Sequence, residues 1–483
     1  MTYVDTFDWR LYRDGSRLAT AVEDGDLTLL WRPPGDGSFC RLPIDRQPDF
    51  VWDLPEGTIR GQIESSVEMR RLLPVAEVFL QGTVWNVIDR RQKILLTFVL
   101  ECGTAVNPID PERKLRLPAA LRVIPVKGYG DVYRKTLAAI EREGAKADSS
   151  CPLELALEIF DRRPLAEVAK PAHDLKPDLR GDLAMKSVHR RQLLAMQRNL
   201  EGLRRNVDTE FLHDFRVAVR RTRSALAQVP EVFPRAVTGR FRRGFSWLGQ
   251  ATGPVRDLDV YLLSLPRYAG DLPEELRPAL APIDRYLRRQ HRLEHRRLVT
   301  SLGTSRFRQM IEAWEKFLDR EAPPRTSLRN ATRPIGELAG ERIRRAHRRV
   351  IKQGKSIKDG SPPQRLHRLR IECKKLRYLL EFFAPLYAEQ DVRRLVGALK
   401  KLQNNLGDHN DYVLQQQSLH AIVDGLSGSG PVPEATRRAV QEVLRQLEER
   451  QRVTRKAFQS RFKQFSDRKV SAVFDRLFGE ARA

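Results

Sequence analysis

Two stretches of eleven residues share one pattern, a histidine followed by a row of cations. The first reads HDFRVAVRRTR at residues 213–223, and the second reads HRLRIECKKLR at residues 367–377. In both, cations stand at positions +3, +7, +8 and +10 from the histidine. Because an α-helix turns by about 100° per residue, positions 0, +3, +7 and +10 fall on one side of it. The pattern therefore predicts two helices, each with a basic stripe that begins with an imidazole.

Each stripe places like charges side by side, which costs about 0.2–0.5 kcal/mol per neighbouring pair. A single basic stripe is most often a solvated helix face. Two copies with a histidine at the same place instead favour a polyanionic partner that offsets the repulsion. The candidate ligands are His213, Arg216, Arg220, Arg221 and Arg223 in the first copy and His367, Arg370, Lys374, Lys375 and Arg377 in the second.

The repeat extends beyond the stripes. A shift of 154 residues places Gly253-x-x-Arg-Asp257 on Gly407-x-x-Asn-Asp411. Asp257 and Asp411 either cap a helix start or orient a cation of the stripe, so structural support is favoured over catalysis. Upstream, Lys186-x-x-His189-Arg-Arg resembles Arg344-x-x-His347-Arg-Arg at an offset of 158. The weaker ligand candidates are therefore Lys186, His189, Arg344 and His347.

Ordered blocks at nearly one offset predict two copies of a helical unit, at residues 182–320 and 328–478. The short breaks between their helices favour antiparallel neighbours. The helices predicted for the first copy span residues 183–206, 209–228, 234–250, 255–265, 274–298 and 304–320. The stripes of the two copies could then face each other across a groove or channel.

Residues 1–165 have a different character. Residues 27–31 and 93–101 predict strands, and residues 64–71 and 132–143 predict helices. Residues 164–178, with Pro164, Pro171 and Pro177, predict a linker. The predicted fold is an α+β N-terminal domain followed by an all-α domain of duplicated helical bundles.

The net charge of +25 is unevenly distributed along the 483 residues. Residues 1–165 hold 23 Lys and Arg against 25 Asp and Glu, whereas the remainder holds 64 against 37. The helical part therefore carries the basicity, which attracts nucleic acid, anionic membranes or phosphate polymers. Guanidinium groups engage two phosphate oxygens at once, and lysine and protonated histidine add further donors. Histidine protonation predicts tighter anion binding at about pH 6 than at about pH 8.

The remaining sequence features indicate the compartment. The four cysteines show neither metal-ligand spacing nor a disulfide framework. The N-terminal residues show no apolar signal segment, and no uncharged apolar stretch approaches the length of a membrane span. We expect a cytoplasmic protein without cofactor, metal or membrane span.

The segments 213–226, 253–260, 367–383 and 406–413 resemble the CHAD domain family. The resemblance covers roughly residues 182–478 and implies two related helical bundles around a basic central pore. It also implies binding of inorganic polyphosphate rather than turnover, by the ligand candidates named above, and an association with polyphosphate granules.

The N-terminal domain resembles the CYTH family, a triphosphate tunnel fold, more distantly. The segment from Tyr3 to Leu18 is similar to that family's YFDT segment. The opening strand of alternating acids and lysine is absent, and residues 18–21 lack the family's basic strand pattern. This implies a truncated CYTH-like partial barrel or sheet that is catalytically degenerate.

Two other functions stay open. A CYTH-type triphosphatase could use the helical region to capture its substrate, but it needs acidic metal ligands that the sequence does not show. A nucleic-acid-binding protein is less favoured, because the stripes contain almost none of the interleaved aromatic residues that stack on bases.

Overall fold

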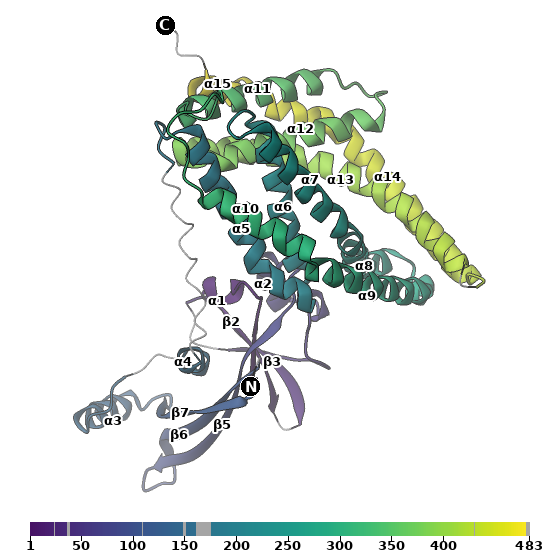
Figure 1. Cartoon of the computed structure of the whole chain (residues 1–483). Coiled ribbons are helices and arrows are strands. Elements are labelled where there is room, and N and C mark those ends of the chain that lie inside the picture. Colours follow the sequence, from purple (N-terminus) through teal and green to yellow (C-terminus); the bar gives the residue numbers. More distant parts are fainter. Residues whose placement is uncertain are drawn as a thin grey trace. The chain divides into compact units, whose positions relative to one another are not determined.

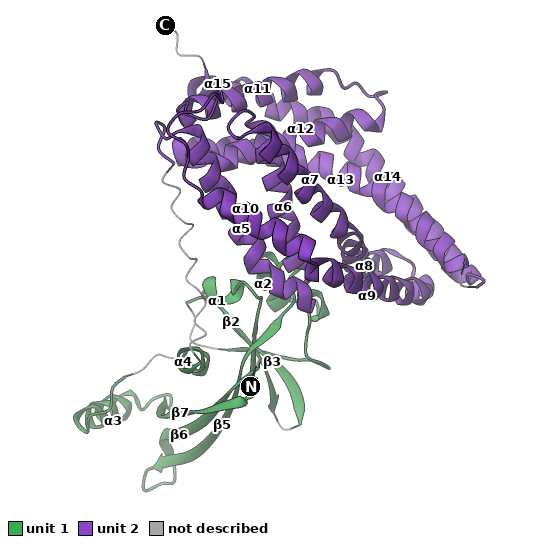
Figure 2. Ribbon diagram, viewed as in Figure 1, with its two compact units in different colours: residues 1–169 green, residues 170–483 purple. Residues whose placement is uncertain are grey.

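A computed structural model describes residues 1–23, 25–35, 39–108, 110–147, 151–160, 175–428 and 430–479. The chain divides into two compact units, residues 1–169 and 170–483 (Figure 2). Of the predicted linker, Pro164 and Pro171 lie outside the described residues.

Unit 1 is built on an antiparallel sheet (Figure 1). Among the described residues the sheet has seven strands, in the order β4-β3-β2-β1-β5-β6-β7. The strands are β1 (Thr2–Asp5), β2 (Arg17–Glu23), β3 (Asp26–Arg32), β4 (Cys40–Pro43), β5 (Leu73–Ile88), β6 (Ile94–Asn107) and β7 (Asp110–Pro125). The predicted strands at 27–31 and 93–101 correspond to β3 and to the first half of β6. The sheet confirms the mixed α+β class of this part of the chain.

The helical segments of unit 1 are α1 (Arg10–Arg13), η1 (Val51–Asp53), α2 (Thr58–Val67), α3 (Gly130–Arg142) and α4 (Pro152–Ile159). The helix predicted at 132–143 is α3. The helix predicted at 64–71 is wrong in its bounds, because the chain turns at Glu68. That residue has a φ of 55°, in the left-handed region that ends a right-handed helix.

Unit 2 is helical, as predicted. Its first half holds α5 (Gly181–Arg205), α6 (Thr209–Gln228), α7 (Arg235–Ala251), α8 (Gly253–Asp271), η2 (Glu274–Leu280), α9 (Ala281–Gly303) and α10 (Ser305–Asp319). Its second half holds α11 (Ile335–Lys355), α12 (Pro363–Phe382), η3 (Ala384–Leu386), α13 (Glu389–Ser427), α14 (Glu434–Phe465) and α15 (Arg468–Phe478). No helix in the described part of the chain combines the length and the apolar character of a membrane span.

The sequence repeat relates the helices of the two halves. By the 154-residue shift, α6 corresponds to α12 and α9 to α14, while α7 and α8 together correspond to α13. In the first half, Thr252 separates α7 from α8. At the corresponding place in the second half, α13 continues as one helix of 39 residues. The segment predicted as one helix at 274–298 is divided into η2 and α9 at Ala281. Pro282 stands in the first turn of α9, where proline is well tolerated.

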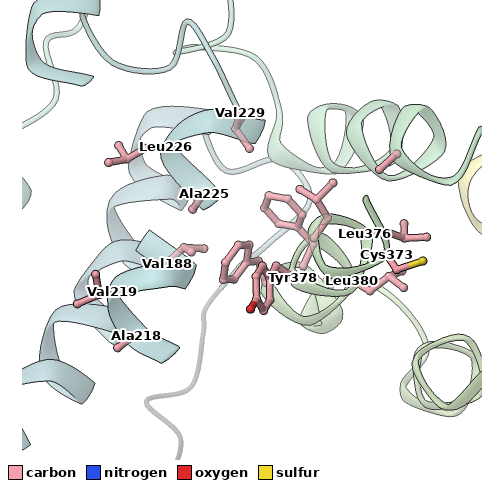
Figure 3. Packing of buried hydrophobic residues seen from close by; sticks show 14 of the residues in the cluster. Val188, Ala218, Val219, Ala225, Leu226, Val229, Cys373, Leu376, Tyr378 and Leu380 are labelled. Atoms are coloured by element: carbon pink, nitrogen blue, oxygen red, sulfur yellow. The ribbon is translucent and has the colours of Figure 1, made fainter. Parts of the chain in front are cut away.

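The two halves of unit 2 share one hydrophobic core. It includes Phe215, Phe245 and Trp314 of the first half together with Phe383 and Phe458 of the second. Figure 3 shows part of this core, with Val219 and Ala225 of α6 on one side and Leu376 and Tyr378 of α12 on the other. A second apolar cluster joins α8 and α9 with α13 and α14. The stripe-bearing helices α6 and α12 are thus held by common packing.

Candidate anion-binding pocket

Both stripes lie on helices whose opposite faces are anchored in the core. On α6, Phe215, Ala218 and Thr222 are buried, and on α12, Leu369 and Cys373 are buried. The start of α6 is fixed by Asp208, whose side chain accepts a hydrogen bond from the Glu210 amide at 2.7 Å. Pro363 occupies the first turn of α12. Burial of these apolar faces orients the cations toward the surface.

A cavity of about 740 Å³ lies between α6, α7 and α12. We call it the basic pocket. Its lining contains no acidic side chain among the described residues. The cations that line it are Arg220 and Arg223 of α6, Arg242 and Arg243 of α7, and Arg370, Lys374 and Lys375 of α12. The structure therefore brings cations of both predicted stripes to one solvent-reachable hollow.

Tyr378 connects the two stripes at the edge of this pocket. Its hydroxyl accepts a hydrogen bond from Nε of Arg220 at 2.6 Å, which ties α6 of the first half to α12 of the second. The Arg221 and Arg377 guanidinium groups lie 5.7 and 5.8 Å from the centre of its ring. Tyr378 is buried, so its ring helps to hold the arginine side chains in place and offers no exposed face on which a base could stack.

Lys374 is the cation most affected by the pocket. Burial, followed by repulsion from Arg370 and Arg220, lowers the pKa of its amino group to about 7. A bound anion would add negative charge beside Lys374 and would raise this pKa. Lys375 is better compensated, since it forms an ion pair with Glu372 at 2.7 Å.

Arg216 and Arg370, which are equivalent in the repeat, have different partners. Arg216 donates to the carbonyl of Gly249 at 3.0 Å and to the Thr252 hydroxyl at 2.7 Å, at the C-terminal end of α7. A cation is favourable there, because helix C-termini carry partial negative charge. Arg370 instead lies 3.5 Å from Asp411 of α13. Arg370 lines the basic pocket and Arg216 does not.

Asp257 and Asp411 do not cap helix starts. Asp411 lies within the continuous helix α13, and Asp257 lies beyond the first turn of α8. The capping alternative was wrong for Asp411 because α13 has no break at Gly407, where Leu402 and Leu406 pack in the core. Asp411 instead pairs with Arg370, and the charge of Asp257 counteracts the lowering of the Arg216 pKa by burial.

Arg221 and Arg377 lie outside the basic pocket. Both approach Glu381: Arg221 donates a hydrogen bond to it, and Nε of Arg377 lies 3.3 Å from its carboxylate. One carboxylate is thus the shared countercharge of a cation from each half, and it joins the two halves.

The histidines of the stripes also lie outside the pocket lining. Nδ1 of His367 is 2.6 Å from the side-chain oxygen of Asn410. His213 lies beside Glu210 and Asp214, and ligand atoms of the three residues come within 4.8 Å of one another. This arrangement could hold a metal ion, which the sequence analysis did not expect. Arg256 lies 3.7 Å from Glu210, so it would compete with a metal ion for this carboxylate.

The weaker candidates Lys186, His189, Arg344 and His347 do not line the basic pocket either. His189 is fully buried 5.0 Å from the Trp314 ring, and burial lowers its pKa to about 3. His347 stacks on Phe474 at 3.8 Å, and burial lowers its pKa to about 4. Both rings are therefore neutral near pH 7 and pack against the last helix of their own half.

Arg242 and Arg243 of α7 were missed by the sequence analysis. Their repeat counterparts are Val396 and Gly397, so a search for duplicated cations passes over them. The available signal was the spacing of Phe241, Phe245 and Leu248, which marks the buried face of α7 and leaves these arginines on the other side.

Comparison with known proteins now identifies the helical unit. A family model for the CHAD domain matches residues 187–420. The chain contains a CHAD domain. A crystal structure of the CHAD domain from the plant Ricinus communis is similar, with 25% identity and a TM-score of 0.50. The match covers 61% of this chain and 94% of that one.

PptA from Streptomyces chartreusis is similar to the chain at 17% identity and a TM-score of 0.42, over 59% of this chain and 99% of that one. A search of curated proteins found no match. The resemblance to the CHAD family predicted from the sequence is confirmed, and the CYTH resemblance of unit 1 stays a prediction.

Proposed function

We propose that the CHAD domain of this protein binds inorganic polyphosphate in the basic pocket. The observation that carries the proposal is the set of seven cations, drawn from three helices and both halves, around one cavity of about 740 Å³. Such a density of like charge destabilises the free protein locally, and a polyanion offsets it.

The chemistry of the lining suits a phosphate chain. Arginine forks engage pairs of non-bridging oxygens, while Lys374 and Lys375 act as point charges. A chain of linked phosphates can meet several of these cations at once and release the counterions of each. A single phosphate satisfies only some of them, so we expect affinity to rise with chain length.

The proposed role is binding without turnover, and the protein would associate with cytoplasmic polyphosphate granules. Support comes from the pocket lining, which among the described residues offers no carboxylates to hold catalytic metal ions beside the anion. The sheet of unit 1 would be a catalytically degenerate relative of the CYTH fold. Release of phosphate from tripolyphosphate with Mg²⁺ or Mn²⁺ would instead favour a triphosphatase.

The test is a titration of the full chain with orthophosphate, tripolyphosphate and long-chain polyphosphate. The pocket variant Arg223→Gln, Arg243→Gln, Lys374→Gln removes one cation from each of the three helices. A matched control, Arg289→Gln, Arg292→Gln, Arg296→Gln, removes three exposed arginines of α9, which line none of the pockets described above.

We expect the pocket variant to weaken long-chain binding by at least about 100-fold, since each lost contact should cost at least about 1 kcal/mol, and the control to change it little. Equal effects of the two variants would contradict the proposal. A preference for DNA over polyphosphate of equal charge would favour nucleic acid as the ligand.

A further inference from the structure

A second cavity adjoins the basic pocket. It has a volume of about 540 Å³ and lies between the end of α6, the first half of α7, the segment 329–333 and α11. Ala227, Gly239 and Arg242 line both cavities. An anion in the basic pocket can therefore continue into this second pocket along α7, with Arg242 reaching both parts.

The second pocket is also strongly basic. Its lining includes two acidic residues, Glu231 and Glu341. The arginines that line it are Arg235, Arg242, Arg329, Arg333, Arg342 and Arg345. Cations thus outnumber carboxylates three to one in the described lining, and the charge that remains is positive.

Glu341 holds three of these arginines together. Its carboxylate lies 3.2 Å from Arg333, 3.1 Å from Arg345 and 4.0 Å from Arg342. Each guanidinium has five N–H donors, whereas one carboxylate accepts about four hydrogen bonds. The cluster is therefore positioned by Glu341 but keeps donors that it cannot satisfy.

Arg342 shows most clearly that hydrogen-bond acceptors are too few for these donors. Its side chain is only 13% exposed, and its buried Nε has no hydrogen-bond partner within the described part of the chain. Burial, with repulsion from Arg345 and Arg333, lowers its pKa. A buried guanidinium with an unused donor beside like charges is costly unless an anion completes it.

We propose that the second pocket binds further phosphates of the polyphosphate chain whose first part occupies the basic pocket. The inference rests on the proposed function of the basic pocket and adds a direction to it. The bound chain runs from α12 across α7, past Arg242, to α11. The length of this track would make the protein selective for long chains.

The test compares tripolyphosphate with long-chain polyphosphate on the full chain. The variant Arg235→Gln, Arg329→Gln, Arg345→Gln removes three exposed arginines that line only the second pocket. We expect its affinity for tripolyphosphate to stay within about twofold and its affinity for long chains to fall at least about tenfold, with a shallower salt dependence. The α9 variant is the matched control.

The outcomes separate the two proposals. If the second-pocket variant binds long chains as well as the α9 control does, while the pocket variant is weakened, the extension is wrong and the basic pocket stands. If tripolyphosphate and long chains are weakened equally, the second pocket is not an extension that only long chains reach. If the pocket variant itself binds both ligands normally, the proposed function fails.

Discussion

At the residue scale, Lys374 carries the pH response of the pocket. Its pKa of about 7 in the folded protein leaves it largely neutral at pH 8 and charged at pH 6. The sequence predicted tighter binding at low pH from the histidines. The structure places His213 and His367 outside the pocket lining, so the same direction is now expected from the lysine.

Binding of polyphosphate at pH 8 should therefore take up a proton, because the anion raises the pKa of Lys374. Calorimetry in buffers with different ionisation enthalpies measures this uptake. We expect it to be lost in Lys374→Gln and kept in Lys375→Gln. Identical binding heats in all buffers for the unaltered protein would contradict this role.

His189 affects the stability of the fold rather than anion binding, and low pH is unfavourable for it. Its folded pKa of about 3 lies below the ordinary value near 6.5, so below pH 6.5 the unfolded chain binds a proton that the folded chain does not. The stability should therefore fall as the pH drops from about 6.5 toward 3.

Replacement His189→Phe, among the rings of Trp314 and Phe233, should move the midpoint of acid unfolding to lower pH and leave polyphosphate binding at pH 7.5 unchanged. Circular dichroism during an acid titration measures the midpoint. His420→Gln, on the exposed surface of α13, is the control. Weaker polyphosphate binding by His189→Phe would instead mean that His189 takes part in binding the anion.

At the element scale, the sequence predicted α6 at its observed bounds, because Asp208 caps its start and its apolar positions recur with helical period. It did not predict that α13 continues where α7 and α8 are separated, because similar glycines stand at both places. The contribution of α7 to the basic pocket was also missed, since Arg242 and Arg243 have no cationic counterparts in the second copy of the repeat. A repeat shows which residues correspond, not which helices form a cavity.

Contacts between α6 and α12 should depend on Glu381. Substitution Glu381→Gln leaves Arg221 and Arg377, each with a side chain 27% exposed, without their shared countercharge. We expect a loss of about 1–3 kcal/mol in the free energy of unfolding. Urea denaturation measures it.

The matched control is Glu389→Gln, which breaks a pair with Arg393 whose side chains are 76% and 75% exposed, and which should cost less than about 1 kcal/mol. Equal small losses in both variants would mean that Glu381 does not join the halves.

At the scale of the whole molecule, the sequence predicted an α+β part followed by a basic helical part, and the structure confirms that order. The common core was not predicted, because two separate cores and one shared core leave the same pattern of apolar residues in a repeat. Phe245 and Phe458, from different halves, both lie in the one core. That common core is what sets the two stripes beside one cavity.

The most direct measurement is the salt dependence of long-chain polyphosphate binding by the unaltered protein, the pocket variant and the α9 variant. The slope of log affinity against log salt should become shallower by about 2–3 in the pocket variant, close to one per lost phosphate contact. The α9 variant should keep the original slope. The same slope and affinity in all three proteins would contradict binding in the basic pocket.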